Sequence, residues 1–230
     1  MNDNQVLLAI PTRGTINFNT VRRILELQEK HPEMLIHLEA GNLGVSHVRN
    51  AIVQQFLKSE CESLLQIDDD VIPPLNILEM AKSVTPERPV IAGPYHIVRP
   101  EMPVPFPCVF TLREPTNGIR PFKPIENPWR EGLVECDGVG TGCMAIHRSL
   151  LEREDMQAPF LMFYTEQGTM LTSDDLAFCS RVRSLGVPIS ADYRYPCDHM
   201  VTVSMQITER GYSKAYTLAR KKEKPLVTLA

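Results

Sequence analysis

At 230 residues, the chain is long enough for one sizeable α/β domain, and a second full domain is not expected. Hydrophobic residues make up 43% and charged residues 23%, as is ordinary for a globular soluble protein. A formal net charge of -4 excludes a sequence-wide electrostatic attraction for nucleic acid, although it leaves room for a local basic groove. No apolar run approaches the length of a transmembrane helix, and Met1–Asn4 lack the basic region of a signal peptide, so we expect a soluble cytoplasmic protein.

The first apolar run, Val6–Ile10, predicts a buried strand that ends at Pro11. Thr12, Arg13 and Gly14 follow as a polar turn at its carboxyl end, where a ligand would be met. An amphipathic helix comes next. The residues expected on its inner side are Val21, Ile24, Leu25 and Leu27.

A second strand is predicted over Met34–Leu38, and Gly41–Gly44 forms a turn. Ser46 is a plausible N-cap for the helix that follows. Arg49 and Asn50 lie near the start of this helix, with side chains free to face the strand ends. Taken locally, they also suit a surface arginine and a second capping amide.

The sequence is organised around a buried strand, Ser63–Ile67, that runs directly into Asp68, Asp69 and Asp70. On an extended chain Asp68 and Asp70 share a side and converge, while Asp69 faces elsewhere. Two converging carboxylates raise each other's pKa unless a cation lies between them. A hard divalent metal that also carries a phosphate meets that need. The alternative is an acidic, solvated turn or helix start.

A helix from about Asn76 to Lys82 and a strand over Val90–Gly93 complete four βα units in about ninety residues, which predicts a nucleotide-binding half-domain over residues 1–93. Prolines then interrupt the pattern between Pro94 and Pro128 and exclude a long helix or a central strand. Because this segment also carries aromatic residues, we expect a packed, functional loop.

Order returns at Leu133–Ile146, a run that contains three glycines. They permit close approach of the backbone to a ligand, and a bulge or tight hairpin explains them equally well. A short helix is expected from Arg148. The chain's six cysteines show no C-x-x-C pair and no zinc-like spacing, so we expect buried thiols.

The clearest helix starts at the N-cap Ser173 and stops at Gly186. Asp174 and Asp175 occupy its first turn, where the helix dipole alone favours acids. A strand over Pro188–Tyr193 leads towards His199, which taken alone is more simply a surface or core histidine than a metal ligand. A basic tail over residues 206–230 closes the chain.

The order of these parts resembles glycosyltransferases of the GT-A fold, in particular the family-2-like group. Asp68–Asp70 resembles the DXD motif, and Ser173–Arg181 is similar to the helix that brings the catalytic carboxylate to the acceptor. His199 stands where many such enzymes place a further metal ligand. The likeness spans roughly residues 5 to 203. Asp174 departs from it, because many relatives have Glu there.

The resemblance implies an α/β fold with a Rossmann-like, mostly parallel central sheet flanked by helices and a smaller acceptor-side β region. It implies one catalytic domain over residues 1–205, with residues 94–205 as the acceptor-side half. The implied activity is transfer of a sugar from a nucleotide diphosphate to a hydroxyl acceptor with inversion.

The site residues follow from the same resemblance. Manganese or magnesium is held by Asp70, His199 and Asp68. Asp175 is the general base and Asp174 the fallback, since adjacent acids are not separable without coordinates. The donor is bound by the following residues: Pro11, Thr12, Arg13, Arg49, Asn50, Asp68 and Asp69.

Two other hypotheses stay open at this point. A non-catalytic module of the same fold would bind a sugar nucleotide or a glycan, and a nucleotidyltransferase would use a related sheet with paired acids. The nucleotidyltransferase hypothesis is weakened because Pro11–Gly14 is too short for the phosphate loop of that class. The donor is a UDP- or GDP-sugar, and the acceptor class is open, with a hydroxylated base in DNA among the options.

Overall fold

The computed structural model describes residues 5–41, 44–98, 105–114, 121–125, 130–164, 166, 168, 170–201, 203–208 and 211–216, with the backbone alone for residues 170, 203–208 and 211–216. Within these residues no helix has the length and apolar character that a membrane span requires. All six cysteines are buried and unbridged, as expected.

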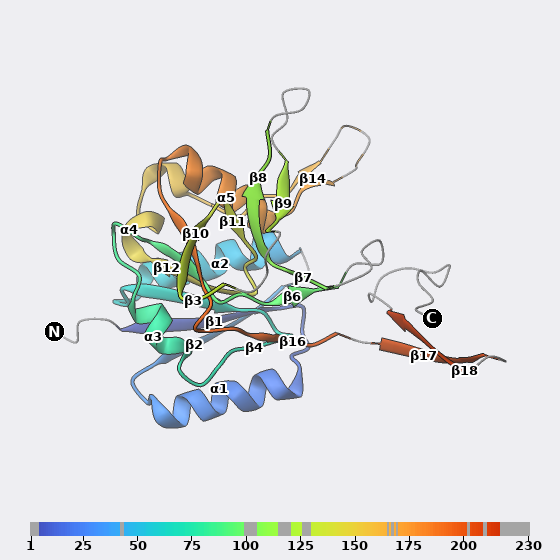
Figure 1. Ribbon diagram of the computed structural model, residues 1–230. Helices are drawn as coiled ribbons and strands as arrows, with labels where there is room; N and C mark the ends of the chain where they lie inside the picture. The colour runs from blue at the N-terminus through green and yellow to red at the C-terminus, as the bar shows by residue number, and fades with distance from the viewer. Residues whose placement is uncertain are drawn as a thin grey trace.

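A seven-stranded sheet forms the centre of the molecule, in the order β10-β15-β5-β12-β3-β1-β2 (Figure 1). β1 is parallel to β2 and β3, and β15 is parallel to β5, whereas β12 is antiparallel to both of its neighbours and β10 is antiparallel to β15. β1, β2, β3, β5 and β15 therefore run in one direction and only β10 and β12 in the other, so the sheet is mainly parallel. Its strands are β1 (Val6–Thr12), β2 (Leu35–Ala40), β3 (Ser63–Ile67), β5 (Val90–Ala92), β10 (Leu133–Cys136), β12 (Cys143–His147) and β15 (Ile189–Asp192).

Helices cover both faces of the sheet, and α1 and α2 lie on opposite sides of it (Figure 1). α1 and α3 pack on one apolar layer, and α2, α4 and α5 on the other. The helices are α1 (Phe18–Lys30), α2 (Val45–Lys58), α3 (Ile77–Lys82), α4 (Arg148–Leu151) and α5 (Asp174–Ser184), with a 3-10 turn over Glu154–Met156.

Short strands complete the structure outside the central sheet. They form a three-stranded sheet, β11-β8-β9, and four pairs: β6–β7, β4–β16, β13–β14 and β17–β18. Their bounds are β4 (Val71–Ile72), β6 (His96–Ile97), β7 (Phe106–Pro107), β8 (Val109–Leu112), β9 (Phe122–Pro124), β11 (Gly138–Val139), β13 (Phe163–Tyr164), β14 (Met170–Thr172), β16 (Asp198–His199), β17 (Val203–Thr208) and β18 (Gly211–Tyr216).

The described part of the proline-rich segment contributes only short strands outside the central sheet, as its prolines predict. Phe106 and Phe110 are buried there, so this part is packed. The remaining residues of the segment, 99–104, 115–120 and 126–129, lie outside the described residues, as does the end of the basic tail from residue 217.

Three local expectations were wrong. β1 continues through Pro11 to Thr12, because Pro11 lies near the end of the strand, where one missing N–H costs little. α2 begins at Val45 with Gly44 as its N-cap, and Ser46 lies inside the helix. Val21 and Leu25 are exposed on α1, whose buried residues are Thr20, Ile24 and Leu27.

Candidate functional site

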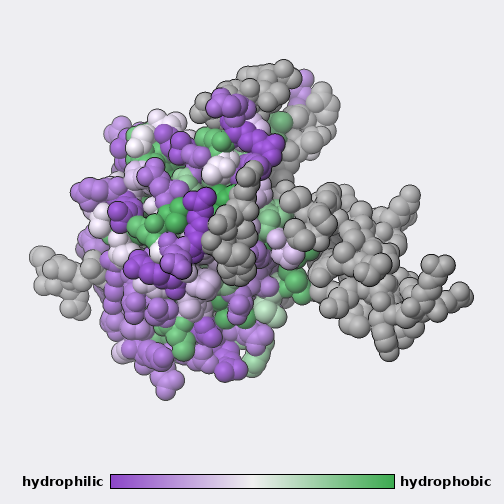
Figure 2. Space-filling view, in the orientation of Figure 1, coloured by the Kyte–Doolittle hydropathy of each residue, from purple (hydrophilic) through white to green (hydrophobic). Residues whose placement is uncertain are grey.

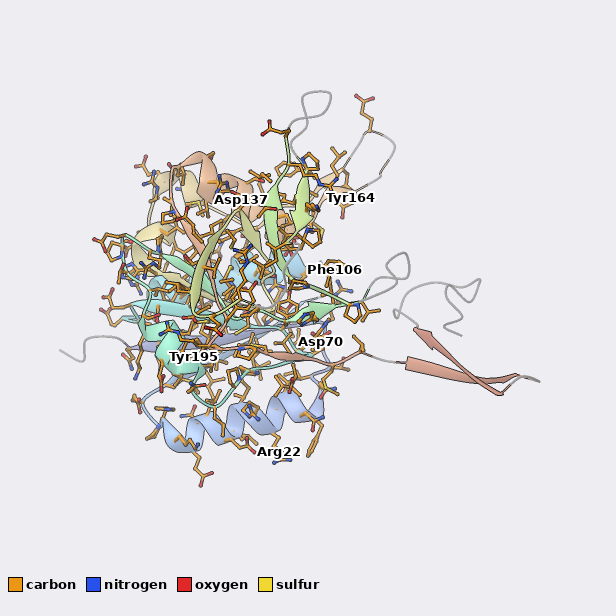
Figure 3. All side chains as sticks on the ribbon, viewed as in Figure 1. Arg22, Asp70, Phe106, Asp137, Tyr164 and Tyr195 are labelled. Carbon is orange, nitrogen blue, oxygen red and sulfur yellow. The ribbon has the colours of Figure 1, made fainter. Side chains whose placement is uncertain are left out.

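A cavity of about 530 Å³ opens at the carboxyl ends of β1 and β3, beside the start of α2. This is where a ligand is expected in a parallel sheet. Figure 3 places Asp70 on the side of the molecule that also carries Tyr164. The residues that line the cavity are Pro11, Thr12, Arg13, Thr15, Val45, Val48, Arg49, Asp68, Asp69 and Asp70.

A tight turn after β1 shapes one wall of the cavity. The Thr12 hydroxyl donates to the carbonyl of Thr15 at 2.9 Å and accepts from the N–H of Gly14 at 3.1 Å. Gly14 has φ +110°, a conformation that residues with a Cβ rarely adopt. The turn leaves Arg13 exposed at the rim, where its positive charge is available to an anionic ligand.

A second turn carries the three aspartates. The N–H of Val71 donates to the carbonyl of Asp68 at 3.1 Å, which closes a turn over residues 68–71. Successive side chains in this turn do not point to opposite sides, as they would in an extended strand. All three carboxylates consequently line the cavity, and the expectation that Asp69 faces elsewhere was wrong. Burial raises the pKa of Asp69, while a hydrogen bond from the Thr12 hydroxyl lowers it.

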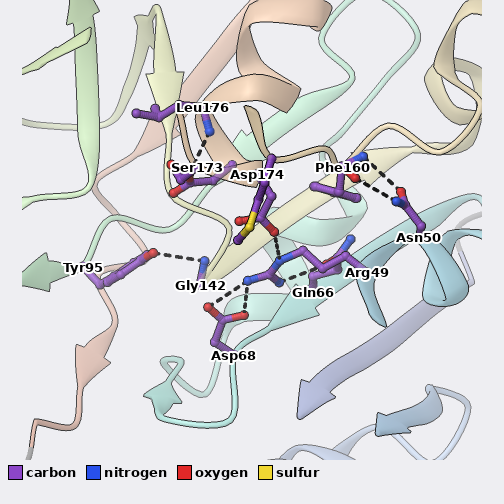
Figure 4. A network of polar contacts seen from close by, with 12 residues as sticks. Arg49, Asn50, Gln66, Asp68, Tyr95, Gly142, Phe160, Ser173, Asp174 and Leu176 are labelled. Atoms are coloured by element: carbon purple, nitrogen blue, oxygen red, sulfur yellow. Dashed lines mark hydrogen bonds and ion pairs between the residues drawn. The ribbon is translucent and has the colours of Figure 1, made fainter. Parts of the chain in front are cut away.

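Arg49 is almost fully buried and joins three acceptors (Figure 4). Nη2 lies 2.8 Å from Oδ1 of Asp68 and donates to Oδ2 at 3.1 Å. Nε donates to Oδ2 of Asp174 at 3.1 Å, and Nη1 donates to Gln66 at 3.2 Å. Burial lowers the pKa of Arg49, but the charges of Asp68 and Asp174 outweigh it and raise the pKa, so the guanidinium stays charged.

The same network separates the two acids of α5. Asp174 is buried and its carboxylate is bound by Arg49. Asp175 keeps an oxygen free: its Oδ1 accepts hydrogen bonds from the Ser173 hydroxyl and, at 2.8 Å, from the N–H of Leu176, whereas Oδ2 has no hydrogen bond from any described residue. Burial raises the pKa of Asp175 above that of an ordinary aspartate.

His199 lies beside Asp70, because β16 pairs with β4 and sets His199 opposite Val71. Nδ1 of His199 donates to the carbonyl of His96 at 2.9 Å, and Nε2 lies 3.4 Å from Oδ2 of Asp70. Burial lowers the pKa of His199, but the hydrogen bond and charge of Asp70 outweigh it and raise the pKa. With Nδ1 engaged as a donor, neutral His199 presents the lone pair of Nε2 towards Asp70.

The expected metal ligands are therefore only partly brought together. Asp70 and His199 adjoin, while Asp68 is held by Arg49. In the part of the chain that the structure describes, no three His, Cys, Asp or Glu side chains are grouped so as to hold a metal ion by themselves. One observation still fits a cation that also takes oxygens from its substrate: Nδ1 of His199 is engaged with His96, which directs Nε2 towards Asp70.

Asn50 is not among the residues that line the cavity. Its side chain donates to the carbonyl of Phe160 at 2.7 Å and accepts from the N–H of the same residue at 3.0 Å. The Phe160 ring stacks on Phe178 of α5, with centroids 4.8 Å apart. Asn50 thus ties α2 to the segment that leads into β13.

Two of the three glycines in the run before β12, Gly140 and Gly142, pack against Tyr95. The N–H of Gly142 donates to the Tyr95 hydroxyl at 3.2 Å, and a Cβ added at Gly142 would lie 2.6 Å from Cζ of Tyr95. The ring of Tyr95 meets the edge of His199, with centroids 5.4 Å apart. Close approach of the backbone to a side chain, rather than to a ligand, accounts for Gly142.

Thr15, Val45, Val48 and Gln66 belong to the site and were not expected from the sequence. The spacing of Val45, Val48 and Arg49 on α2 places all three on one helix face, and that signal could have found the two valines. Thr15 and Gln66 carry no comparable signal, because a turn and a buried network position them.

No protein family model matches the chain, and no curated protein matches its sequence. Its structure is similar to the crystal structure of A197 from STIV, with a TM-score of 0.60 and 17% sequence identity over 95% of this chain and 98% of that chain. The two chains share a fold over nearly their whole lengths.

Other solved structures with lower TM-scores include glycosyltransferases. GalNAc-T7, crystallised with UDP, GalNAc and Mn²⁺, matches with a TM-score of 0.49 and 10% identity over 86% of this chain and 44% of that chain. A glycosyltransferase involved in the glycosylation of the major capsid of PBCV-1 matches with a TM-score of 0.36 and 16% identity over 65% of this chain and 62% of that chain. Likenesses this distant carry no activity over to the chain.

Proposed function

We propose that the protein is a metal-dependent, inverting glycosyltransferase of the GT-A fold that moves a sugar from a nucleotide diphosphate to a hydroxyl acceptor. One observation carries the proposal. Arg49 joins Asp68, in the wall of the cavity, to Asp174 at the start of α5, and Asp175 with its unpaired oxygen is the next residue of that helix. A nucleotide-binding cavity and a general base are thereby held in one rigid unit.

The donor nucleotide occupies the cavity at the ends of β1 and β3 in this proposal. Arg13 at the rim attracts the diphosphate, and Thr12 and Asp69 offer hydrogen-bond partners to ribose hydroxyls. Residues 1–93 supply these groups as the donor half, and residues 94–205 form the acceptor side. Asn50 supports the site from outside by fixing Phe160.

Asp70 and His199 are the residues that would hold a manganese or magnesium ion, while both oxygens of Asp68 lie against Arg49. When bound, such an ion stabilises the negative charge that gathers on a diphosphate leaving group. Burial raises the pKa of Asp68, and the charge and hydrogen bond of Arg49 offset only part of that rise.

Asp175 takes the proton of the acceptor hydroxyl as that oxygen attacks the sugar carbon. A base that directs attack from the side opposite the leaving diphosphate gives inversion. The raised pKa of Asp175 makes it a stronger base than an exposed aspartate, and Asp174 acts by holding Arg49 in place.

The proposal is tested by thermal unfolding with UDP, GDP, CDP and their sugars in manganese, magnesium or chelator. A ligand at 100 times its dissociation constant adds about 2.7 kcal/mol to the free energy of unfolding. We expect such a shift for one nucleotide, in metal only, and its loss in Asp70→Asn. Slow release of free sugar from the matching nucleotide sugar is expected in the wild type.

Asp155→Asn is the matched control, because Asp155 is an exposed aspartate that pairs with Arg153 away from the cavity. It is expected to keep the full shift. If the folded protein, with metal present, shows no shift in thermal unfolding with any of the nucleotides, the proposal is wrong. A metal-dependent shift without turnover of any sugar nucleotide indicates a binding module of the same fold.

A further inference from the structure

β2 is an edge of the central sheet and is not protected in the usual way. It runs for six residues, Leu35–Ala40, and contains neither lysine nor proline. Leu35, Ile36 and Leu38 are exposed, Leu38 to 54%. Natural edge strands usually carry lysine, proline or a cover that prevents pairing with another chain, whereas the one charged residue of β2, Glu39, already pairs with His37. An edge this apolar indicates a partner strand.

The hydrogen-bonding direction of β2 is set by its pairing with β1. The N–H of Gly41 donates to the carbonyl of Thr12 at 3.3 Å, so Gly41 points its backbone groups towards β1. Because successive residues of a strand point these groups to opposite sides, those of Ile36, Leu38 and Ala40 point away from the sheet. They are available to a further strand.

α1 borders the same edge with an apolar stripe. Phe18, Val21 and Leu25 lie on one flank of the helix, with Phe18 exposed to 76% and Leu25 to 62%. Arg23 on the opposite flank donates to the carbonyl of Pro73, next to β4. The stripe therefore faces the β2 side, where Ile36 and Leu38 share the α1 face of the sheet through their register with Leu8 and Ile10.

We propose that β2 is the interface of a symmetric homodimer in which the β2 strands of two copies pair antiparallel about Leu38. This register sets Leu38 opposite Leu38 and Ile36 opposite Ala40, all through outward-pointing backbone groups. One seven-stranded sheet continues into the other, and the two α1 stripes face each other across the joined strands.

Charge selects this register. On the other face of β2, Nε2 of His37 lies 2.9 Å from Oε2 of Glu39. Pairing about Leu38 sets His37 opposite Glu39 of the second copy, so imidazole and carboxylate groups alternate across the junction. Pairing about His37 or Glu39 would set identical groups opposite each other, which is unfavourable for the two carboxylates. Pairing about Ile36 would use only half of the strand.

The first test is the mass of the full chain in solution, by light scattering after gel filtration. We expect about twice the chain mass of 26.0 kDa for the wild type and the single-chain mass for Leu38→Lys, which sets two lysines against each other. Leu75→Lys, at an exposed leucine away from β2, is the control and stays dimeric. A monomeric wild type, or a Leu38→Lys protein that still dimerises, overturns the proposal.

Cysteine variants test the register, and they do not depend on whether the lysine variant folds. In a hydrogen-bonded antiparallel pair the Cα atoms lie about 5.5 Å apart, within the reach of a disulfide. We expect diamide to link Leu38→Cys into a covalent dimer. Ile36→Cys stays unlinked, because its two copies lie four residues, about 14 Å, apart along the strands. A mixture of Ile36→Cys with Ala40→Cys links. The native thiols are all buried. Linkage of Ile36→Cys alone contradicts the register.

Discussion

Arg49 places one positive charge between two carboxylates, and Arg49 and Asp174 are themselves almost fully buried. Removing one member of a buried ion network leaves charges without partners, which costs more than the network itself contributes. Lysine keeps the charge but lacks the planar fork that reaches Asp68, Asp174 and Gln66 at once. The position of the start of α5 consequently depends on this residue.

Arg49→Lys is expected to lower the free energy of unfolding by about 1–3 kcal/mol, because lysine keeps the charge but leaves at least one of the three acceptors without its hydrogen bond. Urea denaturation measures it. Arg22→Lys is the matched control: Arg22 pairs with Glu26 on the exposed side of α1, and its loss is expected to leave the unfolding midpoint close to that of the wild type. Equal effects of the two substitutions would contradict a buried role for Arg49.

Asp175 links activity to stability. Burial raises the pKa of Asp175 in the folded protein, so the folded state holds the proton more tightly than the unfolded chain does. The stability associated with the protonated group is complete below the unfolded pKa of about 3.9 and is lost as the pH rises through the raised folded pKa.

Asp175→Asn keeps the group neutral at every pH, so we expect it to melt at a higher temperature than the wild type at pH 7 and at the same temperature below about pH 3.9. Sugar transfer is expected to disappear while nucleotide binding stays. Thermal melts across pH measure the first effect. A variant that melts lower than the wild type at pH 7 would show that the ionised carboxylate is stabilising in the folded state.

At the scale of elements, α2 lines the cavity with one face and binds the segment before β13 with another. Val45, Val48 and Arg49 line the cavity, while Asn50, one residue further on, turns to the other side and binds Phe160. Because Phe160 stacks on Phe178, the same segment also packs against α5. The loop that precedes β13 is thereby fixed to the two helices that form the site.

Asn50→Ala removes both hydrogen bonds to the Phe160 backbone. Leaving buried backbone groups without partners costs about 1–3 kcal/mol each, so we expect lower stability and faster hydrogen exchange at the Phe160 amide. Gln54→Ala, at an exposed position on the same helix, is expected to change neither. Unchanged exchange at Phe160 in Asn50→Ala would mean that other contacts hold the loop.

Several strands can be predicted from the sequence, because a strand buried on both faces leaves an unbroken apolar run, as in Val6–Ile10. The position of Asp68–Asp70 at the strand end follows too. The orientation of Asp69 does not, because the turn is held by backbone hydrogen bonds with Asn17, Gly142 and Met200, which are distant in the sequence. Val21 and Leu25 looked like core residues because periodicity reports an apolar face but not whether anything covers it.

At the scale of the whole molecule, two apolar layers enclose the central sheet, and its visible surface is mostly polar with small apolar areas (Figure 2). Among the described strands, β17 and β18 pair only with each other, and this hairpin crosses the expected boundary between domain and tail at residue 205. The sheet itself is complete at Asp192.

A chain that ends at Val201 is expected to keep the fold, because every strand of the central sheet and His199 precede that residue. Its thermal midpoint and its nucleotide-induced shift should match those of the full chain. A large loss of stability on truncation would assign a structural role to residues 202–230 that strand pairing does not predict.

The antiparallel strand β12 fills the middle of the sheet although it is made late. β3 and β5 flank it, and roughly fifty residues separate the end of β5 from the start of β12. At a synthesis rate of about 5–20 residues per second, roughly 3–10 s pass between the synthesis of β5 and that of β12. Until then, the edges of β3 and β5 that pair with β12 have no partner strand. During that interval the nascent protein is a natural client for a chaperone.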